Sequence, residues 1–478
     1  MISSTEMAVV DANAEALGVP RKQLMESAGN AVARVVREVA DLGDSVVLVC
    51  GRGNNGGDGF AAARFLSEYD VTVLLLGRNE TITTDIAREN WEALGAAELD
   101  AREIVDSTAI GLEEPDVIVD AMLGTGTTGA LREPEASAAE LMNDANAPVV
   151  SVDVPSGVDA DTGEREAIAV DADYVVTFHD EKAGLEAIDA DVTVADIGIP
   201  EAAVRFVERG DLLRLTRNPA AHKGDFGRVL VIGGGPYTGA PALSAQAALR
   251  AGADLAYVAA PETIAHEIQG YSEDLIVRPF PGDRLEPSDC QELLELSEKM
   301  DCVVFGPGLG DASETLDAVA AFLSEYDGTA VVDADALQVV PEIETDATLV
   351  CTPHQGELRK MGCETADDWH ERADLVEAFA AELGATVLLK GAYDIITDGS
   401  RTRVNRTGNP GMTVGGTGDV LAGATGAMAC VLDPLPAAAV GAYANGRAGD
   451  LVVEERGYGL VATDLLEALP RALWPNAD

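Results

Sequence analysis

Basic residues, and lysines above all, are scarce in this sequence. Only six lysines occur among 478 residues, and 32 basic residues stand against 83 acidic ones, which gives a formal net charge of −51. A nucleic-acid binder needs a basic surface that displaces counterions from phosphates, and an anionic membrane repels an acidic chain. We therefore expect neither nucleic acid nor membranes as partners. The acid excess favours a halophilic protein, because concentrated cations screen charge repulsion beyond about 3 Å at 1 M.

Cysteines are also few and widely spaced. The six in the chain form no close pair of the kind that builds a disulfide framework or a zinc ribbon. The first residues lack the long apolar stretch of a secretory signal. We expect the chain to act in the reducing cytoplasm, and to do so as a homo-oligomer.

The chain is too long for one hydrophobic core, and its apolar content of 47% suffices for two. Short β-branched runs alternate with helical stretches in both halves, which predicts two parallel α/β domains. The halves meet at residues 210–227, where a helical segment gives way to Pro, Gly and polar residues, so we expect domains 1–214 and 215–478. The predicted strands lie within residues 45–50, 71–77, 116–123, 147–155, 228–235, 254–261, 302–308, 329–337, 347–353 and 386–391.

A glycine-rich loop follows the first predicted strand. GRGNNGGDG (51–59) contains G-x-G-x-x-G, in which glycines let backbone amides and a helix start approach a pyrophosphate. A tight turn without a ligand is the alternative. Gly77 and Arg78 stand where a dinucleotide-dependent dehydrogenase carries an acidic ribose-binding residue, which disfavours that class.

Further polar loops follow later strands of the same half. They are DAMLGTGTTGA (120–130), DVPSGVD (153–159) and FHDEKAG (178–184). Asp, Asn and Ser oxygens at adjacent strand ends suit a hard cation, and glycine loops accept phosphates. The pattern predicts a site for an anionic ligand and a cation.

These motifs resemble the NAD(P)H-hydrate epimerase family over residues 1–210, as does the opening with Asp11 and LMESAG (24–29). The resemblance implies a Rossmann-like three-layer sandwich, a potassium ion, and proton transfer by Asp153 and Lys182. It implies potassium ligands at Asn55, Asp120 and Ser156. It also implies substrate contacts at Asn54, Asn55, Gly56, Gly57, Asp58, Gly124, Thr125, Gly126, Thr127, Thr128, Gly129, Ala130 and Asp153.

Both proton-transfer candidates have plainer interpretations. Asp153 precedes a Ser-Gly turn, where an aspartate commonly caps the turn. The plainer interpretation of Lys182 is an exposed surface residue.

The second half contains NPGMTVGGTGDVLAG (409–423), a glycine-rich turn that leads into a helix with Asp419 in its first turn. Amides at such a helix start stabilise a phosphoryl group, and the carboxylate is placed to take a proton from the hydroxyl that attacks it. A simple Gly-Asp helix cap is the alternative, although it leaves the many glycines unexplained.

Five more segments extend the pattern: KGDFGRVLVIGG (223–234), TGAPALSAQAALRAGAD (238–254), FGPGLG (305–310), TPHQGEL (352–358) and LLKGA (388–392). Together they resemble the ADP- or ATP-dependent NAD(P)H-hydrate dehydratase family, a ribokinase-like α/β fold, over residues 215–470. The resemblance implies Asp419 as the catalytic base and Mg²⁺ bound with ADP. It implies substrate contacts at Ala240, Gly308, His354 and Asp419, and nucleotide contacts at Lys390, Gly391, Ala392, Tyr393, Asp394 and Gly418. Asp254 departs from the family pattern, in which Gly is frequent.

His354 and Lys390 have structural alternatives as well. A lone histidine is more often structural than catalytic, whereas its place beside Pro353 and Glu357 in a strand-end loop favours a ligand contact. Lys390 could be a surface residue at a strand end, whereas its position before Gly391 favours a phosphate contact.

The two resemblances together imply repair of hydrated NADH and NADPH. One half would interconvert the R and S hydrates, NADHX and NADPHX, and the other would dehydrate the S form with ADP, giving AMP and phosphate. Two alternatives remain open. The second half could be a kinase of a vitamin precursor that releases a phosphorylated product, and the first half could be a binding module without catalysis.

Overall fold

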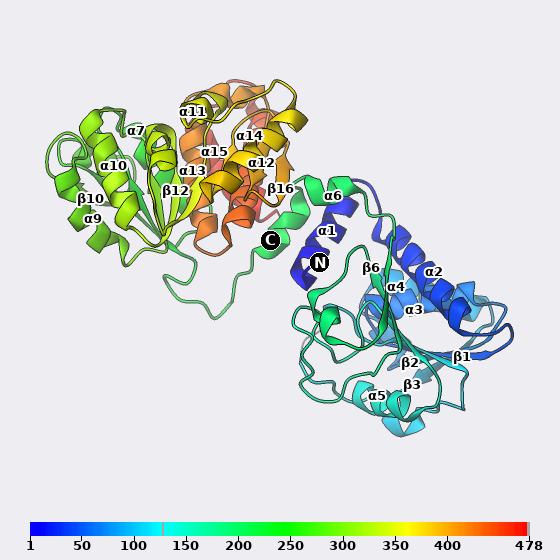
Figure 1. Ribbon diagram of the computed structural model, residues 1–478. Coiled ribbons are helices and arrows are strands. Elements are labelled where there is room, and N and C mark those ends of the chain that lie inside the picture. Colours follow the sequence, from blue (N-terminus) through cyan, green and yellow to red (C-terminus); the bar gives the residue numbers. More distant parts are fainter. Residues whose placement is uncertain (127–128, 476–478) are drawn as a thin grey trace. The chain divides into compact units, whose positions relative to one another are not determined.

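The structure is a computed structural model that describes residues 1–126 and 129–475 (Figure 1). Its internal contacts divide the chain into two compact units, Met1–Ala203 and Val204–Asp478. The sequence placed the boundary later, near residue 214. The positions differ because the amide of Val207 donates a hydrogen bond of 3.0 Å to the carbonyl of Val404, which ties the segment after Ala203 to a strand of the second unit.

Unit 1 contains a seven-stranded parallel sheet in the order β3-β2-β1-β4-β5-β6-β7. Its first six strands follow the Rossmann order. The order reverses between β1 and β4, and ligands of such sheets bind at the carboxyl ends of strands beside that reversal. The strands are β1 (Ser45–Cys50), β2 (Asp70–Leu76), β3 (Asp100–Ile104), β4 (Val117–Ala121), β5 (Val149–Val152), β6 (Tyr174–Phe178) and β7 (Asp191–Ala195).

Helices cover both faces of this sheet, which confirms the predicted three-layer sandwich. One core joins α1, α2 and α3 to one face, and another joins α5 to the opposite face. The helices are α1 (Ser4–Ala16), α2 (Arg21–Val39), α3 (Asn54–Phe65), α4 (Asp85–Ala96), α5 (Glu135–Asp144) and α6 (Glu201–Arg205), with short 3-10 helices at Asn79–Thr81, Ser107–Ala109 and Ala183–Ala187.

Unit 2 contains a nine-stranded sheet in the order β10-β9-β8-β11-β12-β13-β14-β15-β16. The strands from β10 to β14 are parallel, and β15 and β16 extend the sheet in antiparallel fashion. The strands are β8 (Arg228–Ile232), β9 (Leu255–Pro261), β10 (Ile276–Phe280), β11 (Cys302–Phe305), β12 (Thr329–Val332), β13 (Thr348–Cys351), β14 (Thr386–Leu389), β15 (Asp394–Thr397) and β16 (Thr402–Asn405).

This second sheet also has helices on both faces. One core includes α7, α13, α14 and α15, and the other includes α9, α10 and α12. The helices are α7 (Gly239–Arg250), α8 (Ala265–Gln269), α9 (Cys290–Ser297), α10 (Ser313–Glu325), α11 (Gln355–Lys360), α12 (Trp369–Leu383), α13 (Thr417–Ala429), α14 (Pro434–Arg456) and α15 (Ala462–Leu473), with 3-10 helices at Arg209–Arg214, Pro287–Asp289, Ala334–Glu342 and Pro410–Thr413.

Helix α13 is held in place by close contact with α7. A Cβ atom on Gly423 would lie 1.9 Å from the carbonyl oxygen of Ser244, so only glycine permits this approach. The Ser244 hydroxyl donates a 2.8 Å hydrogen bond to the carbonyl of Asp419. The start of α13 is therefore fixed beside α7, which packs on β8 and β9.

Across the described ranges 1–126 and 129–475, no helix has the length and apolar character needed to cross a lipid bilayer.

Candidate active sites

The glycine loop after β1 leads directly into α3, as the sequence predicts. A Cβ atom on Gly56 would lie 2.0 Å from the carbonyl oxygen of Gly51, and one on Gly51 would lie 1.9 Å from that of Met122. These two glycines allow the start of α3 to pack against the ends of β1 and β4. Gly53 has open space at its Cβ position.

Asp120, at the end of β4, is fully buried and accepts hydrogen bonds with both carboxylate oxygens. Oδ1 accepts from the Ser156 hydroxyl at 2.6 Å, and Oδ2 accepts from the Ser156 amide and the Ser151 hydroxyl, each at 2.9 Å. Burial raises the pKa of Asp120, and the hydrogen bonds oppose that rise. Two of the three predicted potassium ligands thus contact each other directly.

Asn55, the third predicted ligand, is buried in the first turn of α3. Its Nδ2 atom has no hydrogen-bond partner among the described residues. A Cβ atom on Gly124 would lie 3.2 Å from Asn55 Oδ1 and 3.4 Å from Asp153 Oδ2, so three segments predicted to form the site converge here. An unpaired buried amide costs about 1–3 kcal/mol, which a ligand can recover.

Asp153 and Lys182 form an ion pair. Lys182 Nζ lies 2.8 Å from Asp153 Oδ1 and donates a further 2.8 Å hydrogen bond to the carbonyl of Phe178. The lysine side chain is fully buried, so the exposed-surface interpretation of Lys182 is wrong. Asp153 has a φ of +69°, a left-handed backbone conformation that is uncommon for residues other than glycine and recurs at functional sites.

Two further carboxylates face this pair. Burial, together with the charge of Asp153, raises the pKa of Asp11 to about 6, while Arg21 and Lys182 oppose the rise. Burial and the charges of Asp153 and Asp11 raise the pKa of Asp58 well above its ordinary value. The sequence associated Asp11 only with the first helices, whereas its electrostatic interaction with Asp153 and Lys182 follows from the packing of α1.

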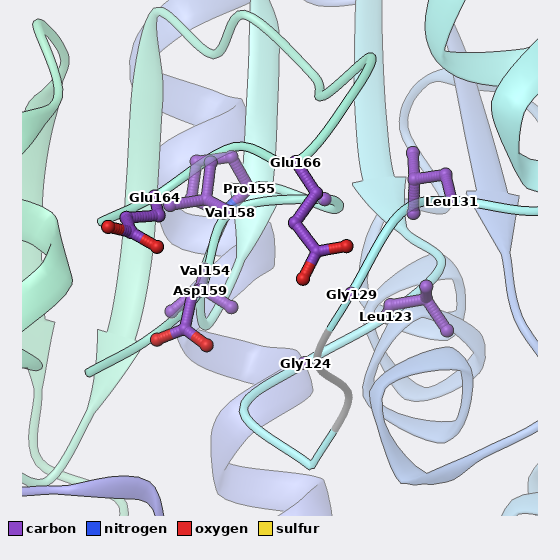
Figure 2. A pocket seen from close by; sticks show the side chains of 11 residues that line it. Leu123, Gly124, Gly129, Leu131, Val154, Pro155, Val158, Asp159, Glu164 and Glu166 are labelled. Atoms are coloured by element: carbon purple, nitrogen blue, oxygen red, sulfur yellow. The ribbon is translucent and has the colours of Figure 1, made fainter. Parts of the chain in front are cut away.

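A pocket that is open to solvent lies between the loops that follow β4 and β5 (Figure 2). Gly124 and Gly129 line it, opposite Val154, and the carboxylates of Asp159 and Glu166 border it. Thr125, Gly126 and Ala130 belong to the same loop, whereas Thr127 and Thr128 lie outside the described residues. The predicted ligand loop therefore borders a real cavity.

In unit 2, the glycine-rich turn ends at Gly416, which has a φ of +96° and precedes the first residue of α13. Asp419 lies in the first turn of that helix. Burial, reinforced by the charge of Asp333, raises the pKa of Asp419 to about 7, while Lys390 opposes the rise. Near neutral pH this carboxyl can both accept and release a proton, as a general base requires.

Lys390, at the end of β14, points towards the start of α13. A Cβ atom on Gly418 would lie 3.5 Å from Lys390 Nζ. The ammonium lies 2.8 Å from Asp333 Oδ1 and 3.6 Å from Glu357 Oε2. Burial lowers the pKa of Lys390, but the charges of Asp333, Glu357 and Asp419 outweigh that effect and raise it, so the ammonium remains charged.

His354 caps helix α11. Its Nδ1 atom accepts hydrogen bonds from the amides of Gly356 at 2.9 Å and Glu357 at 3.1 Å. The structural alternative for His354 is therefore present in the molecule. Since Nδ1 is occupied as an acceptor, the neutral ring carries its proton on Nε2, which lies 3.5 Å from Glu357 Oε1 on a side chain that is 59% exposed.

The other predicted contacts lie in two places. A Cβ atom on Gly308 would be 3.3 Å from the Cβ of Ala240, so these two residues are neighbours at the end of β11 and the start of α7. Gly391, Ala392, Tyr393 and Asp394 form the turn between β14 and β15, which Asp394 closes by accepting a 2.8 Å hydrogen bond from the Gly391 amide. Burial raises the pKa of Asp394 to about 6.

Asp254, which departs from the family pattern, has a structural role. Its Oδ2 accepts hydrogen bonds from the amides of Gly224 at 2.7 Å and Phe226 at 3.1 Å. It thereby fixes the loop that enters β8.

Within residues 1–126 and 129–475, no three His, Cys, Asp or Glu side chains are grouped so that they could hold a metal ion. A divalent cation at either site would need ligands from a substrate or from other protein oxygens.

The two units define a two-domain α/β protein. The Rossmann-like unit 1 has the Asp153–Lys182 ion pair at its strand ends. In unit 2, helix α13 begins after Gly416, and Asp419 and Lys390 lie beside its first turn. The sequence model of a family described as NAD(P)H-hydrate dehydratase matches residues 229–471, and that of the YjeF-related protein N-terminus matches residues 21–184.

Curated relatives span the whole chain. A bifunctional NAD(P)H-hydrate repair enzyme from Methanothermobacter thermautotrophicus is 44% identical and covers 100% of this chain and 96% of its own length. One from Pyrobaculum aerophilum is 46% identical, covering 99% and 98% respectively. The chain belongs to the family of bifunctional NAD(P)H-hydrate repair enzymes.

A solved structure resembles unit 2. The ADP/ATP-dependent NAD(P)H-hydrate dehydratase from Bacillus subtilis, co-crystallised with ATP and Mg²⁺, is 26% identical with a TM-score of 0.51, and covers 57% of this chain and 99% of its own. A ribokinase-like superfamily protein from Enterococcus faecalis is 25% identical with a TM-score of 0.50, covering 57% and 95%. The predicted ribokinase-like fold is confirmed.

Proposed function

We propose that this chain repairs hydrated NADH and NADPH. Unit 1 interconverts the R and S hydrates, and unit 2 dehydrates the S form with ADP, giving AMP and phosphate. The proposal rests on one observation: Asp419 and Lys390 lie beside the backbone amides of residues 416–418 at the start of α13. The chain also belongs to the hydrate repair family.

The dehydratase chemistry begins with a poor leaving group. In a hydrate, water has added across a ring double bond of the dihydronicotinamide, and its hydroxyl does not leave readily. Asp419 accepts the hydroxyl proton as the oxygen attacks the terminal phosphorus of ADP and AMP leaves. The C–O bond then breaks, phosphate departs with the bonding electrons, and loss of a ring proton restores the double bond.

The residues of unit 2 have separate roles in this reaction. The amides of residues 416–418 stabilise the charge on the transferring phosphoryl group. Lys390 neutralises phosphate oxygens, and the turn of Gly391, Ala392, Tyr393 and Asp394 holds the rest of the nucleotide. Ala240, Gly308 and His354 contact the hydrated nicotinamide, with His354 Nε2 donating a hydrogen bond.

Mg²⁺ would arrive with the nucleotide. Its preferred oxygen ligands are then mainly the phosphates, which fits a site without a three-carboxylate cage among the described residues. The use of ATP and Mg²⁺ in crystals of the related Bacillus subtilis dehydratase supports this assignment.

In unit 1, Asp153 and Lys182 transfer the protons of epimerisation. The substrate contacts the start of α3, from Asn54 to Asp58, and the loop from Gly124 to Ala130. A potassium ion held by Asn55, Asp120 and Ser156 supplies fixed positive charge beside that anionic substrate. The Asn55 side-chain oxygen, which lies beside Gly124, and the buried Asp120 and Ser156 oxygens, which are 2.6 Å apart, are ligands of the kind that a hard cation takes.

We further propose a cytoplasmic, salt-adapted homo-oligomer. The six cysteines are free, which suits a reducing compartment. Light scattering of the purified chain tests the assembly directly.

The proposal is tested by incubating the protein with mixed hydrate epimers and KCl, adding ADP or ATP in turn. Recovery of reduced-cofactor absorbance with ADP is expected. A stable phosphorylated product without recovery favours a vitamin-precursor kinase instead. Complete repair of both epimers by Asp153→Ala favours a non-catalytic first unit.

A further inference from the structure

A network of buried polar side chains surrounds Lys390. Asp333 follows β12, Thr352 follows β13, and Lys390 ends β14, so three neighbouring strand ends contribute to it. Asp333 Oδ1 accepts hydrogen bonds from Lys390 Nζ and the Thr352 hydroxyl, each at 2.8 Å. Asp333 is only 3% exposed, and Thr352 is fully buried.

The backbone around Asp333 leaves this carboxylate little freedom. A Cβ atom on Gly306 would lie 1.9 Å from the Asp333 carbonyl oxygen, so the two strand ends are in close contact. Ala334, the next residue, has a φ of +57°, a left-handed conformation that is held by its surroundings in residues other than glycine. The carboxylate therefore presents a fixed oxygen to the ammonium.

We infer that Asp333 is a positioning residue of the dehydratase site, which holds the Lys390 ammonium against the start of α13 so that it meets the nucleotide phosphates. The inference rests on the proposed function of unit 2. Asp333 does not itself touch the nucleotide; it acts through Lys390. Thr352 supports it by fixing the same carboxylate oxygen.

A lysine side chain loses considerable rotamer entropy when it is held in one conformation. A charge-assisted hydrogen bond to a rigid carboxylate supplies that restraint before the nucleotide binds. Glu357 contributes less, since it lies 3.6 Å from the ammonium and also accepts a 2.7 Å hydrogen bond from the His354 amide. The raised pKa of Lys390 supports a persistent charge at this position.

A double-mutant cycle in the full chain tests the inference. Asp333→Asn should raise the KM for ADP by about tenfold, with a smaller effect on the KM for the hydrate. Lys390→Met should raise it further. The KM for ADP of the double variant should be no higher than that of Lys390→Met alone, because the inference has Asp333 reach the phosphates only through Lys390. The charge of Asp333 also raises the pKa of Asp419, so its effect on the base should appear in the pH dependence of kcat and not in the KM for ADP. If the increases in the KM for ADP of the two single variants multiply in the double variant, the inference is overturned.

Two variants separate positioning from general damage to the fold. Thr352→Val keeps the charge of Asp333 and should raise the KM for ADP by less than Asp333→Asn does. Asp335→Asn is the control, because it makes the same substitution on a partly exposed side chain two residues further along the chain. It should leave the KM for ADP unchanged. The melting temperature of each variant reports on the integrity of unit 2, which carries the substitutions, and its epimerase activity reports on that of unit 1.

Calorimetric titration with ADP and Mg²⁺ measures the same cycle as dissociation constants. These binding measurements test the inference even if the protein restores no reduced cofactor. A failure to restore reduced cofactor would overturn the proposed function but not the inference. Wild-type ADP affinity and wild-type KM in Asp333→Asn would overturn the inference and leave the proposed function intact.

Discussion

Lys182 Nζ lies 2.8 Å from Asp153 Oδ1, and the lysine side chain is fully buried. An ammonium without solvent is stable only beside an opposite charge. Each residue therefore fixes the position of the other, at the strand ends where the epimerisation is proposed to occur.

Removing one partner of this pair should destabilise unit 1. Lys182→Met leaves the Asp153 carboxylate without its main partner, and breaking a buried pair in this way costs about 3 kcal/mol. We expect a lower melting temperature together with loss of R/S exchange, measured by chromatography of the hydrate epimers. Lys299→Met, at an exposed position, is the matched control and should change neither.

The raised pKa of Asp419 predicts a pH-dependent dehydratase. The carboxylate form is the base, so kcat/KM should rise with pH through about 7. Asp419→Asn should abolish dehydration at every pH and leave R/S exchange intact. Substantial residual activity in this variant would exclude Asp419 as the base.

The same substitution should stabilise the fold above neutral pH. The folded pKa of Asp419, about 7, exceeds the unfolded value of about 4, so the group stabilises the folded state at low pH and loses that contribution as the pH rises through about 7. Asp419→Asn should therefore raise the melting temperature by about 3 °C or more at about pH 8, and by less at about pH 5. An equal change at both pH values would contradict the raised pKa.

His354 combines a helix cap with a proposed ligand contact, and two substitutions separate them. Asparagine is also a good N-cap, whereas alanine is not. His354→Asn should keep the stability of unit 2 and raise the KM for the hydrate, while His354→Ala should also lose about 1 kcal/mol of stability. If His354→Asn has the wild-type KM, the histidine is structural only.

The net charge of −51 predicts stabilisation by salt. Between about 0.1 and 2 M KCl the melting temperature should rise, because shorter screening lengths weaken the repulsion among surface carboxylates. NaCl at equal ionic strength should stabilise the fold similarly but support epimerisation less, since the proposed site selects potassium. A melting temperature independent of KCl would contradict salt adaptation.

The strands within the sheets were largely predictable from the sequence. All ten predicted runs contain strands, because strands buried on both faces are continuous apolar runs. Six strands were not predicted: β3, β6, β7, β10, β15 and β16. Four of these, β3, β7, β10 and β16, are the edge strands of the two sheets, and in β3 the side chains of Arg102 and Glu103 are exposed. Strand β6 is buried inside its sheet, so edge exposure does not explain why it was missed. Strands β15 and β16 are only four residues each and extend the sheet in antiparallel fashion.

The candidate sites were predictable where a motif follows a strand. Asp153, Lys182 and Lys390 lie at such positions, and Asp419 lies in the first turn of the helix that follows the glycine-rich turn. The roles of Asp11 and Asp333 were not predictable, because they depend on contacts between segments that are distant in sequence. Asp11 reaches its site through the packing of α1, and Asp333 reaches Lys390 across the end of the intervening strand β13.

One measurement tests the central claim most directly. Purified chain in KCl is mixed with R and S hydrates, ADP and Mg²⁺, and the absorbance of reduced cofactor is followed alongside AMP and phosphate. Wild-type protein should convert both epimers completely, with one AMP and one phosphate for each cofactor restored, and Asp419→Asn should restore none. No recovery by the wild-type protein, or equal recovery by Asp419→Asn, would contradict the account.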